Sequence, residues 1–98
     1  MKTLLGGFVV ALVLAGATAA QAADGQTVYN QNCGACHNAM KPKLGDKDAW
    51  APLIKQGIDA LVASTIKGKG AMPPRGGKPN LSDDDIKAAV EYMVSKAQ

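Results

Sequence analysis

The sequence predicts a small all-α domain of four helices, and three observations support this. Apolar residues recur with the period of a helix, most clearly at Ile86, Ala89, Val90 and Met93. Aspartate and serine residues stand where helix N-termini need a capping side chain, and glycines follow the apolar runs. No segment has the alternating or β-branched pattern of a strand. We therefore expect helices and no sheet.

The first two helices each begin at an aspartate. Asp24 is placed to cap a helix that leads into Cys33, and Asp46 or Asp48 can cap a second helix that Gly57 ends. The apolar residues that these two helices carry are Val28, Tyr29, Trp50, Leu53 and Ile54.

The last two helices have clear boundary residues. Asp59 is placed to cap a third helix, and Gly68 stops this helix before the loop 69–77. Ser82 with Asp85 resembles a capping box at the start of the last helix. The residues expected on the inward faces are Leu61, Val62 and Ile66 in the third helix and Ile86, Ala89, Val90 and Met93 in the last.

Cys33, Cys36 and His37 form a C-x-x-C-H run, and they are the only cysteines and the only histidine of the chain. This run is the attachment signature of covalently bound haem. Positions three and four apart share one face of a helix, so both thiols and the imidazole point the same way. We therefore expect one covalent haem c, attached through Cys33 and Cys36, with His37 as an axial iron ligand.

Other chemistries also use closely spaced cysteines. A thioredoxin-like redox pair lies in a βαβ context, for which the chain has no strand pattern. A structural zinc site needs four ligands, and this chain offers three within five residues. A haem-free module with a structural disulfide stays open as an alternative, because a lone cysteine pair in an oxidising compartment normally becomes a disulfide.

The first 22 residues have the pattern of a cleaved secretory signal peptide. Lys2 begins a charged region, residues 4–14 are apolar, and Ala20-Gln21-Ala22 is an A-x-A cleavage site. A membrane anchor would need about 20 apolar residues, but Gly16 interrupts the stretch. We expect one mature haem domain over residues 23–98, with no membrane span, in the bacterial periplasm.

The second axial ligand decides between electron transfer and chemistry at an open iron position. Because His37 is the only histidine, methionines remain. Met40 is too close to His37, since three residues reach at most about 10 Å. Met93 continues the apolar stripe of the last helix and is expected in the core. Met72 lies in a loop stiffened by two prolines, and we expect it to be the distal ligand; the alternative is a loop methionine that fills a gap.

With these residues placed, the chain resembles the monohaem class I c-type cytochromes, especially the short bacterial cytochromes c5. The residues that carry the resemblance are Val28-Tyr29 before Cys33-to-His37, the turn 42–46, Trp50, Ala71-Met72-Pro73-Pro74 and Val90-Glu91-Tyr92-Met93. Many c5 relatives have a second Cys pair where this chain has residues 76–81. The resemblance implies a fold wrapped around a haem with His37 and Met72 as ligands, and a first helix packed against the last.

The resemblance also implies roles for residues near the haem. The free N–H of His37 would donate to a backbone carbonyl, with Pro42 as the expected acceptor, unless Pro42 only turns the chain. Trp50 would either direct its indole N–H to a haem propionate or bury its ring in the core. Tyr29 and Tyr92 are expected to be packing residues.

The expected function follows from the occupation of both axial positions of the haem iron. With both axial positions filled, substrate and oxygen find no vacant position, and the iron only changes between the ferrous and ferric states. We therefore expect an electron carrier rather than an enzyme, with a reduction potential above that of a bis-histidine haem. The alternative is a haem-based sensor or weak peroxidase in which the Met72 bond is labile.

Charge gives an expectation about partners. The chain has 11 Lys and Arg against 8 Asp and Glu, a net charge of +3, and this small excess gives no support for nucleic-acid binding. We expect a monomer with a cationic rim at the haem edge that docks acidic redox proteins, with Asp83 to Asp85 lying elsewhere; the alternative is an ordinary solvated surface. The cations of this rim are Lys67, Lys69, Arg75 and Lys78 near the methionine loop, with Lys41 and Lys43 after the haem motif.

Overall fold

The computed structural model describes residues 24–98, and this part of the chain is helical. The elements in chain order are α2 (Gly25–Val28), η3 (Tyr29–Cys33), α3 (Gly34–His37), α4 (Lys47–Ile54), α5 (Ile58–Lys67), η4 (Pro74–Gly77) and α6 (Asp83–Lys96). Because α2, η3 and α3 follow one another without a break, they form one N-terminal helix. η4 is a short turn in which Arg75 and Gly76 have left-handed φ and ψ angles. The prediction of four helices without a strand is confirmed for these residues.

The residues before Asp24 lie outside this description, and the predicted signal peptide with its cleavage site falls among them. Between Asp24 and the C-terminus, none of the helices has the length and apolar character that crossing a membrane requires.

Three of the predicted helix starts are confirmed. The Asp24 carboxylate accepts a hydrogen bond from the Thr27 N–H, and the Asp46 carboxylate accepts one from the Ala49 N–H. Ser82 and Asp85 form a complete capping box at the start of α6. These side chains satisfy backbone donors that the first turn of a helix leaves without a partner.

The predicted cap of the third helix was wrong. Gly57, at φ 91°, precedes the first helical residue of α5, so Asp59 lies inside the first turn. There its charge favours the helix dipole without capping the N-terminus. Gly68 does end α5 as predicted, again at φ 91°, where a side chain would also meet the nitrogen of Pro74.

The N-terminal helix contains a π-helical segment at η3, which the sequence did not predict. The Gly34 N–H donates to the Tyr29 carbonyl, five residues earlier, and the Asn32 side-chain amide donates to the Val28 carbonyl at 3.0 Å. One π turn therefore lies immediately before the attachment motif and rotates the residues after it relative to α2. Single π turns of this kind occur mainly at functional sites.

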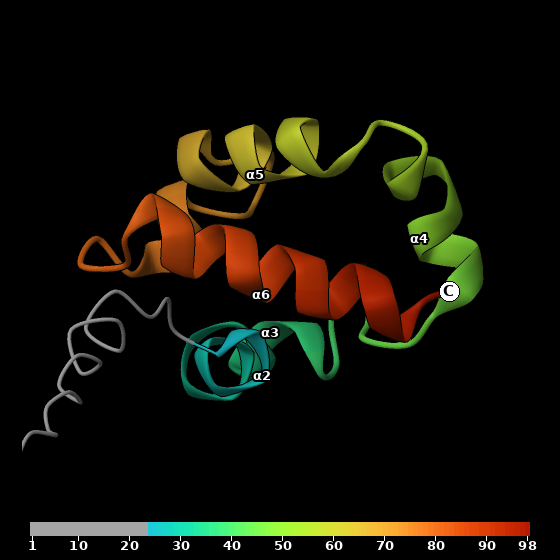
Figure 1. The fold of residues 1–98 in the computed structure, drawn as a ribbon, viewed down its shortest axis with the longest axis horizontal. Coiled ribbons are helices and arrows are strands. Elements are labelled where there is room, and N and C mark those ends of the chain that lie inside the picture. Colours follow the sequence, from blue (N-terminus) through green and yellow to red (C-terminus); the bar gives the residue numbers. More distant parts are fainter. Residues whose placement is uncertain (1–23) are drawn as a thin grey trace, which may run out of the picture.

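Helix α6 lies between the N-terminal helix and α5, with α4 at its C-terminal end (Figure 1). The close approach of α2 to α6 depends on Gly25, because a Cβ at this position would overlap the Ala88 carbonyl oxygen. The rings of Tyr29 and Tyr92 meet across the same interface at a centroid distance of 5.5 Å. The buried core is built around α6 and consists of Tyr29, Trp50, Leu61, Ile86, Val90, Met93, Val94 and Ala97.

Candidate haem site

A deep cleft opens between the N-terminal helix and the segment that joins α5 to α6. Its volume is about 490 Å³, which lies within the range of about 300 to 1,000 Å³ usual for cofactor pockets. Cys33, Cys36 and His37 line it together with Met72. The other side chains of its walls are mostly apolar and come from α4, α5 and α6, including Trp50, Leu53, Leu61, Val90 and Met93. Two cysteine thiols and a histidine beside an apolar cavity of this size fit a covalently attached haem.

The His37 ring is oriented by a backbone carbonyl. Its Nδ1 atom lies 2.9 Å from the Pro42 oxygen, the acceptor expected from the resemblance. A carbonyl only accepts, so the proton must be on Nδ1, and Nε2 keeps its lone pair. The neutral tautomer that binds iron is thus the one that this contact selects.

The two cysteines differ in their surroundings. Cys33 is half-buried at the end of η3, whereas Cys36 is exposed in α3, and both are free thiols. Burial raises the pKa of the Cys33 thiol, and a charge on Cys36 would raise it further.

Met72 is held by backbone hydrogen bonds at one end of its loop. The Lys69 N–H donates to the Met72 carbonyl and the Met72 N–H donates to the Lys69 carbonyl, each at 2.9 Å. Gly68 precedes this pair, and a Cβ there would lie 3.1 Å from the Met72 oxygen. The loop thus turns sharply and brings the thioether to the cleft wall.

The other predicted residues take different positions. Trp50 is buried, and its indole N–H donates to the Lys43 carbonyl at 3.0 Å, so this N–H already has a backbone partner. Met93 belongs to the core, as predicted, and also reaches the cleft. Met40 is 57% exposed at the cleft.

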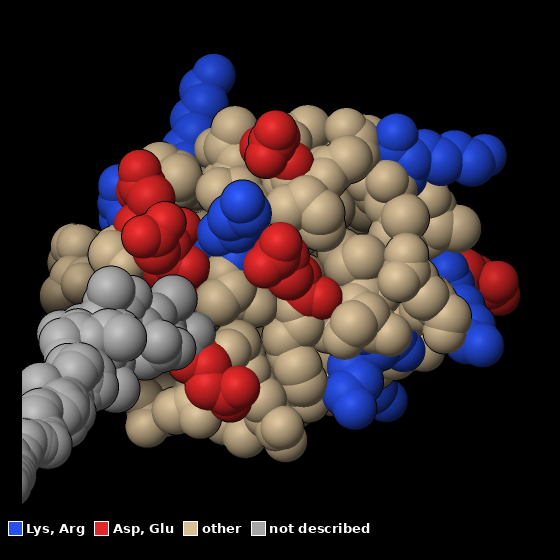
Figure 2. Space-filling model, viewed as in Figure 1, with Lys and Arg blue, Asp and Glu red and all other residues tan. Residues whose placement is uncertain are grey.

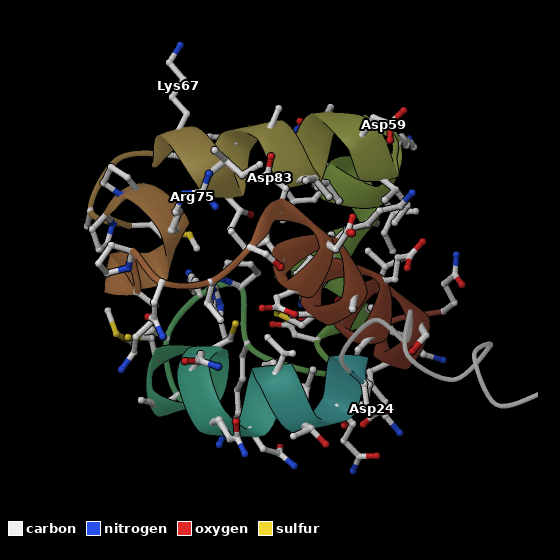
Figure 3. The ribbon with its side chains drawn as sticks, turned by 60° about the vertical axis from the view of Figure 1, so that its left-hand side comes forward. Asp24, Asp59, Lys67, Arg75 and Asp83 are labelled. Carbon is white, nitrogen blue, oxygen red and sulfur yellow. The ribbon has the colours of Figure 1, made fainter. Side chains whose placement is uncertain are left out.

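The predicted separation of cations from Asp83 to Asp85 was wrong. Arg75 Nη2 lies 2.8 Å from Asp83 Oδ1, so one member of the predicted rim is paired with an acidic residue (Figure 3). Lys41 and Lys69 line the cleft, while Lys67 points away from the protein into solvent in the same view. Positive and negative side chains are interspersed on the face drawn in Figure 2.

Several site residues were not recognised from the sequence as such. Leu61 and Val90 lie in the core as expected, but they also line the cleft together with Leu53. Helical periodicity does not distinguish a core position from a cleft wall. Thr65 also lines the cleft, and its hydroxyl donates to the Leu61 carbonyl at 2.8 Å. A polar pair, Ser64 and Thr65, in the middle of this helix was the available signal.

Known proteins of similar sequence are cytochromes. A family model described as cytochrome c oxidase, cbb3-type, subunit III, matches residues 20–93. Cytochrome c-555 of Chlorobaculum tepidum is 44% identical over 94 residues, which cover 89% of this chain and 87% of that protein. Cytochrome c5 of Azotobacter vinelandii is 40% identical over 77 residues, which cover 74% of this chain and 93% of that protein.

Two solved structures share the fold. A chain in the crystal structure of an electron transfer complex of nitrite reductase with cytochrome c is 49% identical, with a TM-score of 0.73 over 76% of this chain and 94% of that chain. The reduced cytochrome c551 of Ectothiorhodospira halophila, solved by NMR, is 36% identical, with a TM-score of 0.62 over 74% of this chain and 99% of that chain. Such cytochromes are small electron carriers with one covalent haem c. The chain belongs to the monohaem class I c-type cytochromes.

Proposed function

We propose that this protein is a periplasmic electron carrier, not an enzyme, whose haem iron is held by His37 and Met72. The observation that supports this most strongly is that Met72 lines the same cleft as Cys33, Cys36 and His37. When bound, the haem supplies an iron that gains and loses one electron. Two protein ligands would leave no position for a substrate.

The residues of the chain would control the site by position and by exclusion of water. The Pro42 carbonyl fixes the orientation of His37. By accepting a hydrogen bond from the Nδ1–H group, it makes Nε2 a stronger ligand. The apolar side chains of Leu53, Leu61 and Val90 keep water from the cleft. A low-polarity site and a thioether ligand both favour the less charged ferrous state, so we expect a higher potential than in a bis-histidine haem, to be measured by equilibrium redox titration.

The ligand assignment is tested by absorption spectra of the matured protein. In the ferric state, the wild type should have the weak long-wavelength band of a sulfur-to-iron bond, and Met72→Ala should lose it completely. Met40→Ala is the matched control, because Met40 lines the same cleft but is exposed, and it should keep the band.

The same spectra also distinguish an electron carrier from the second candidate function. If the wild type binds haem without the band, and its ferrous form binds carbon monoxide, a sensor or weak peroxidase with a labile Met72 bond is favoured. A colourless product after expression with haem-maturation machinery would favour the haem-free disulfide module.

The N-terminus of the mature protein tests the periplasmic location. If residues 1–22 are a signal peptide, N-terminal sequencing of the protein from a periplasmic extract should begin at Ala23. A chain that keeps Lys2 would contradict both cleavage and the boundary of the mature domain.

A nitrite reductase is a candidate redox partner, because the cytochrome c of the related complex was captured with one. We propose that Lys41 and Lys69, which line the cleft, steer such a partner to the haem edge. Lys67, Lys78 and Lys43 would extend this rim, whereas the charge of Arg75 is compensated by Asp83.

A further inference from the structure

Arg75 ties the end of the methionine loop to the start of α6. Its Nη1 donates to the Leu81 carbonyl at 2.8 Å, and its Nη2 lies 2.8 Å from Asp83 Oδ1. Figure 3 shows Arg75 and Asp83 facing each other above the loop. We call this pair of contacts the Arg75 clasp. A guanidinium can hold two acceptors at fixed angles, which an ammonium cannot do.

The backbone at Arg75 is in a conformation that side chains rarely adopt. Its φ is 57° and its ψ is 26°, and among residues 24–98 no other residue except glycine has a positive φ. This left-handed conformation is unfavourable for a residue with a side chain and persists only where surrounding contacts hold it.

Hydrogen bonds make the segment after Arg75 a closed ring. The Lys78 N–H donates to the Arg75 carbonyl at 3.1 Å, and the Leu81 N–H donates to the Lys78 carbonyl at 3.0 Å. The Leu81 carbonyl then accepts from Arg75 Nη1, which returns to the starting residue. Hydrogen bonds alone close this ring, which spans residues 75–81.

The ring lies beside Met72. The Gly76 N–H donates to the Pro73 carbonyl at 3.0 Å, one residue beyond Met72. The Met72 methyl carbon lies 3.8 Å from the place of a Cβ at Gly76, and Arg75, Gly76 and Met72 line one small cavity with Cys33. The segment that carries Met72 is therefore flanked on both sides, by the hydrogen bonds between Met72 and Lys69 and by the ring that the Arg75 clasp closes.

We propose that Arg75 is a positioning residue for the distal ligand, and that its clasp sets how firmly the Met72 thioether stays on the haem iron. The inference rests on the proposed ligation by Met72. Leu81 and Asp83 hold the guanidinium, the guanidinium holds residues 75 and 76 in their left-handed conformation, and these residues support the methionine. Loosening the clasp lets the sulfur leave while the helices stay folded.

The first test compares Arg75→Asn with Lys67→Asn. Asparagine tolerates the left-handed conformation, so Arg75→Asn removes the contacts and keeps the turn. Lys67→Asn removes the same charge from a side chain that points into solvent. We expect the equilibrium constant for losing the sulfur-to-iron bond to rise about tenfold in Arg75→Asn and to stay unchanged in Lys67→Asn. The readouts are carbon monoxide binding by the ferrous protein and the temperature at which the ferric band is half lost.

A second pair keeps the test valid if Arg75→Asn does not fold. Asp83→Asn removes the ion pair and keeps the bond to Leu81, whereas Asp84→Asn removes the same charge from the same helix turn. We expect about a two- to threefold rise in bond loss for Asp83→Asn and none for Asp84→Asn, since a partly exposed ion pair is weak. Arg75→Lys, which keeps the positive charge, should raise the loss of the sulfur-to-iron bond less than Arg75→Asn does.

Helix content measured by circular dichroism in the same samples separates positioning from a structural role. If the band disappears only together with the helices in every variant, Arg75 merely stabilises the fold and the inference is overturned. If all variants keep the wild-type band and carbon monoxide behaviour, the inference also fails, but ligation by Met72 stands. A wild type without the band would instead overturn the proposed function.

Discussion

At the scale of single residues, Tyr29 connects the core to the haem motif. It is almost fully buried, its hydroxyl donates to Asn38 Oδ1 at 2.6 Å, and Asn38 directly follows His37. A Cβ at Gly34 would lie 3.2 Å from both the Tyr29 ring and the Asn38 amide. Gly34 thus lets the tyrosine pass behind the attachment helix. The sequence predicted that Tyr29 packs, but the partner of its hydroxyl depends on the π turn that lies between Tyr29 and Asn38.

Burial raises the pKa of Tyr29 above its usual value, with smaller contributions from Cys33 and Tyr92. The unfolded state, with a tyrosine pKa of about 10, therefore loses its proton first. Stability from the neutral hydroxyl is fully present below about pH 10 and is lost as the pH rises toward the pKa of the folded state. Tyr29→Phe should cost about 1 kcal/mol at pH 7 and should unfold with a smaller alkaline loss than the wild type.

Urea unfolding of the holoprotein at pH 7 and pH 11 measures this difference. Tyr92→Phe leaves the Tyr29 hydrogen bond in place and removes only a minor contribution to its pKa, so it should keep most of the alkaline loss of the wild type. An equal alkaline loss in the wild type and Tyr29→Phe would show that the buried hydroxyl is not its source.

At the scale of elements, the helix boundaries were largely predictable and the loop geometry was not. Asp24, Asp46 and Ser82 cap helices as expected because a capping bond involves residues only three apart in the chain. The π turn in η3 leaves no mark on the apolar pattern. The contact between Arg75 and Asp83 requires a positive φ at an arginine, which sequence gives no reason to expect.

The packing of α2 on α6 provides a prediction at this scale. Gly25→Ala should lower the free energy of unfolding by about 2 to 3 kcal/mol, because the new methyl group overlaps the Ala88 carbonyl and the helices must separate. Gln26→Ala, at the next and exposed position, should change it by less than about 0.5 kcal/mol. Urea titrations of the holoproteins check this, and similar values for the two variants would contradict a close approach at Gly25.

At the scale of the whole molecule, the proposed docking depends on the cationic groups at the cleft rather than on the net charge. Lys69 lines the cleft, whereas Lys87 on α6 does not. Lys69→Gln should slow electron exchange with an acidic partner about twofold at low ionic strength, and Lys87→Gln should leave it unchanged. Stopped-flow rates over a salt series with a nitrite reductase measure this. A rate that does not depend on salt would remove electrostatic steering from the proposed function.

The cleft also has a consequence for how the protein folds. Its apolar walls come mainly from α4, α5 and α6, and Trp50, Leu61, Val90 and Met93 belong both to these walls and to the core. A haem bound between these walls covers their apolar surface, and removing apolar surface from water favours the compact state. Because the folded walls bind the group far better than an open chain can, attachment and folding are linked equilibria. The cytochrome is therefore completed, and not merely loaded, when its haem is attached.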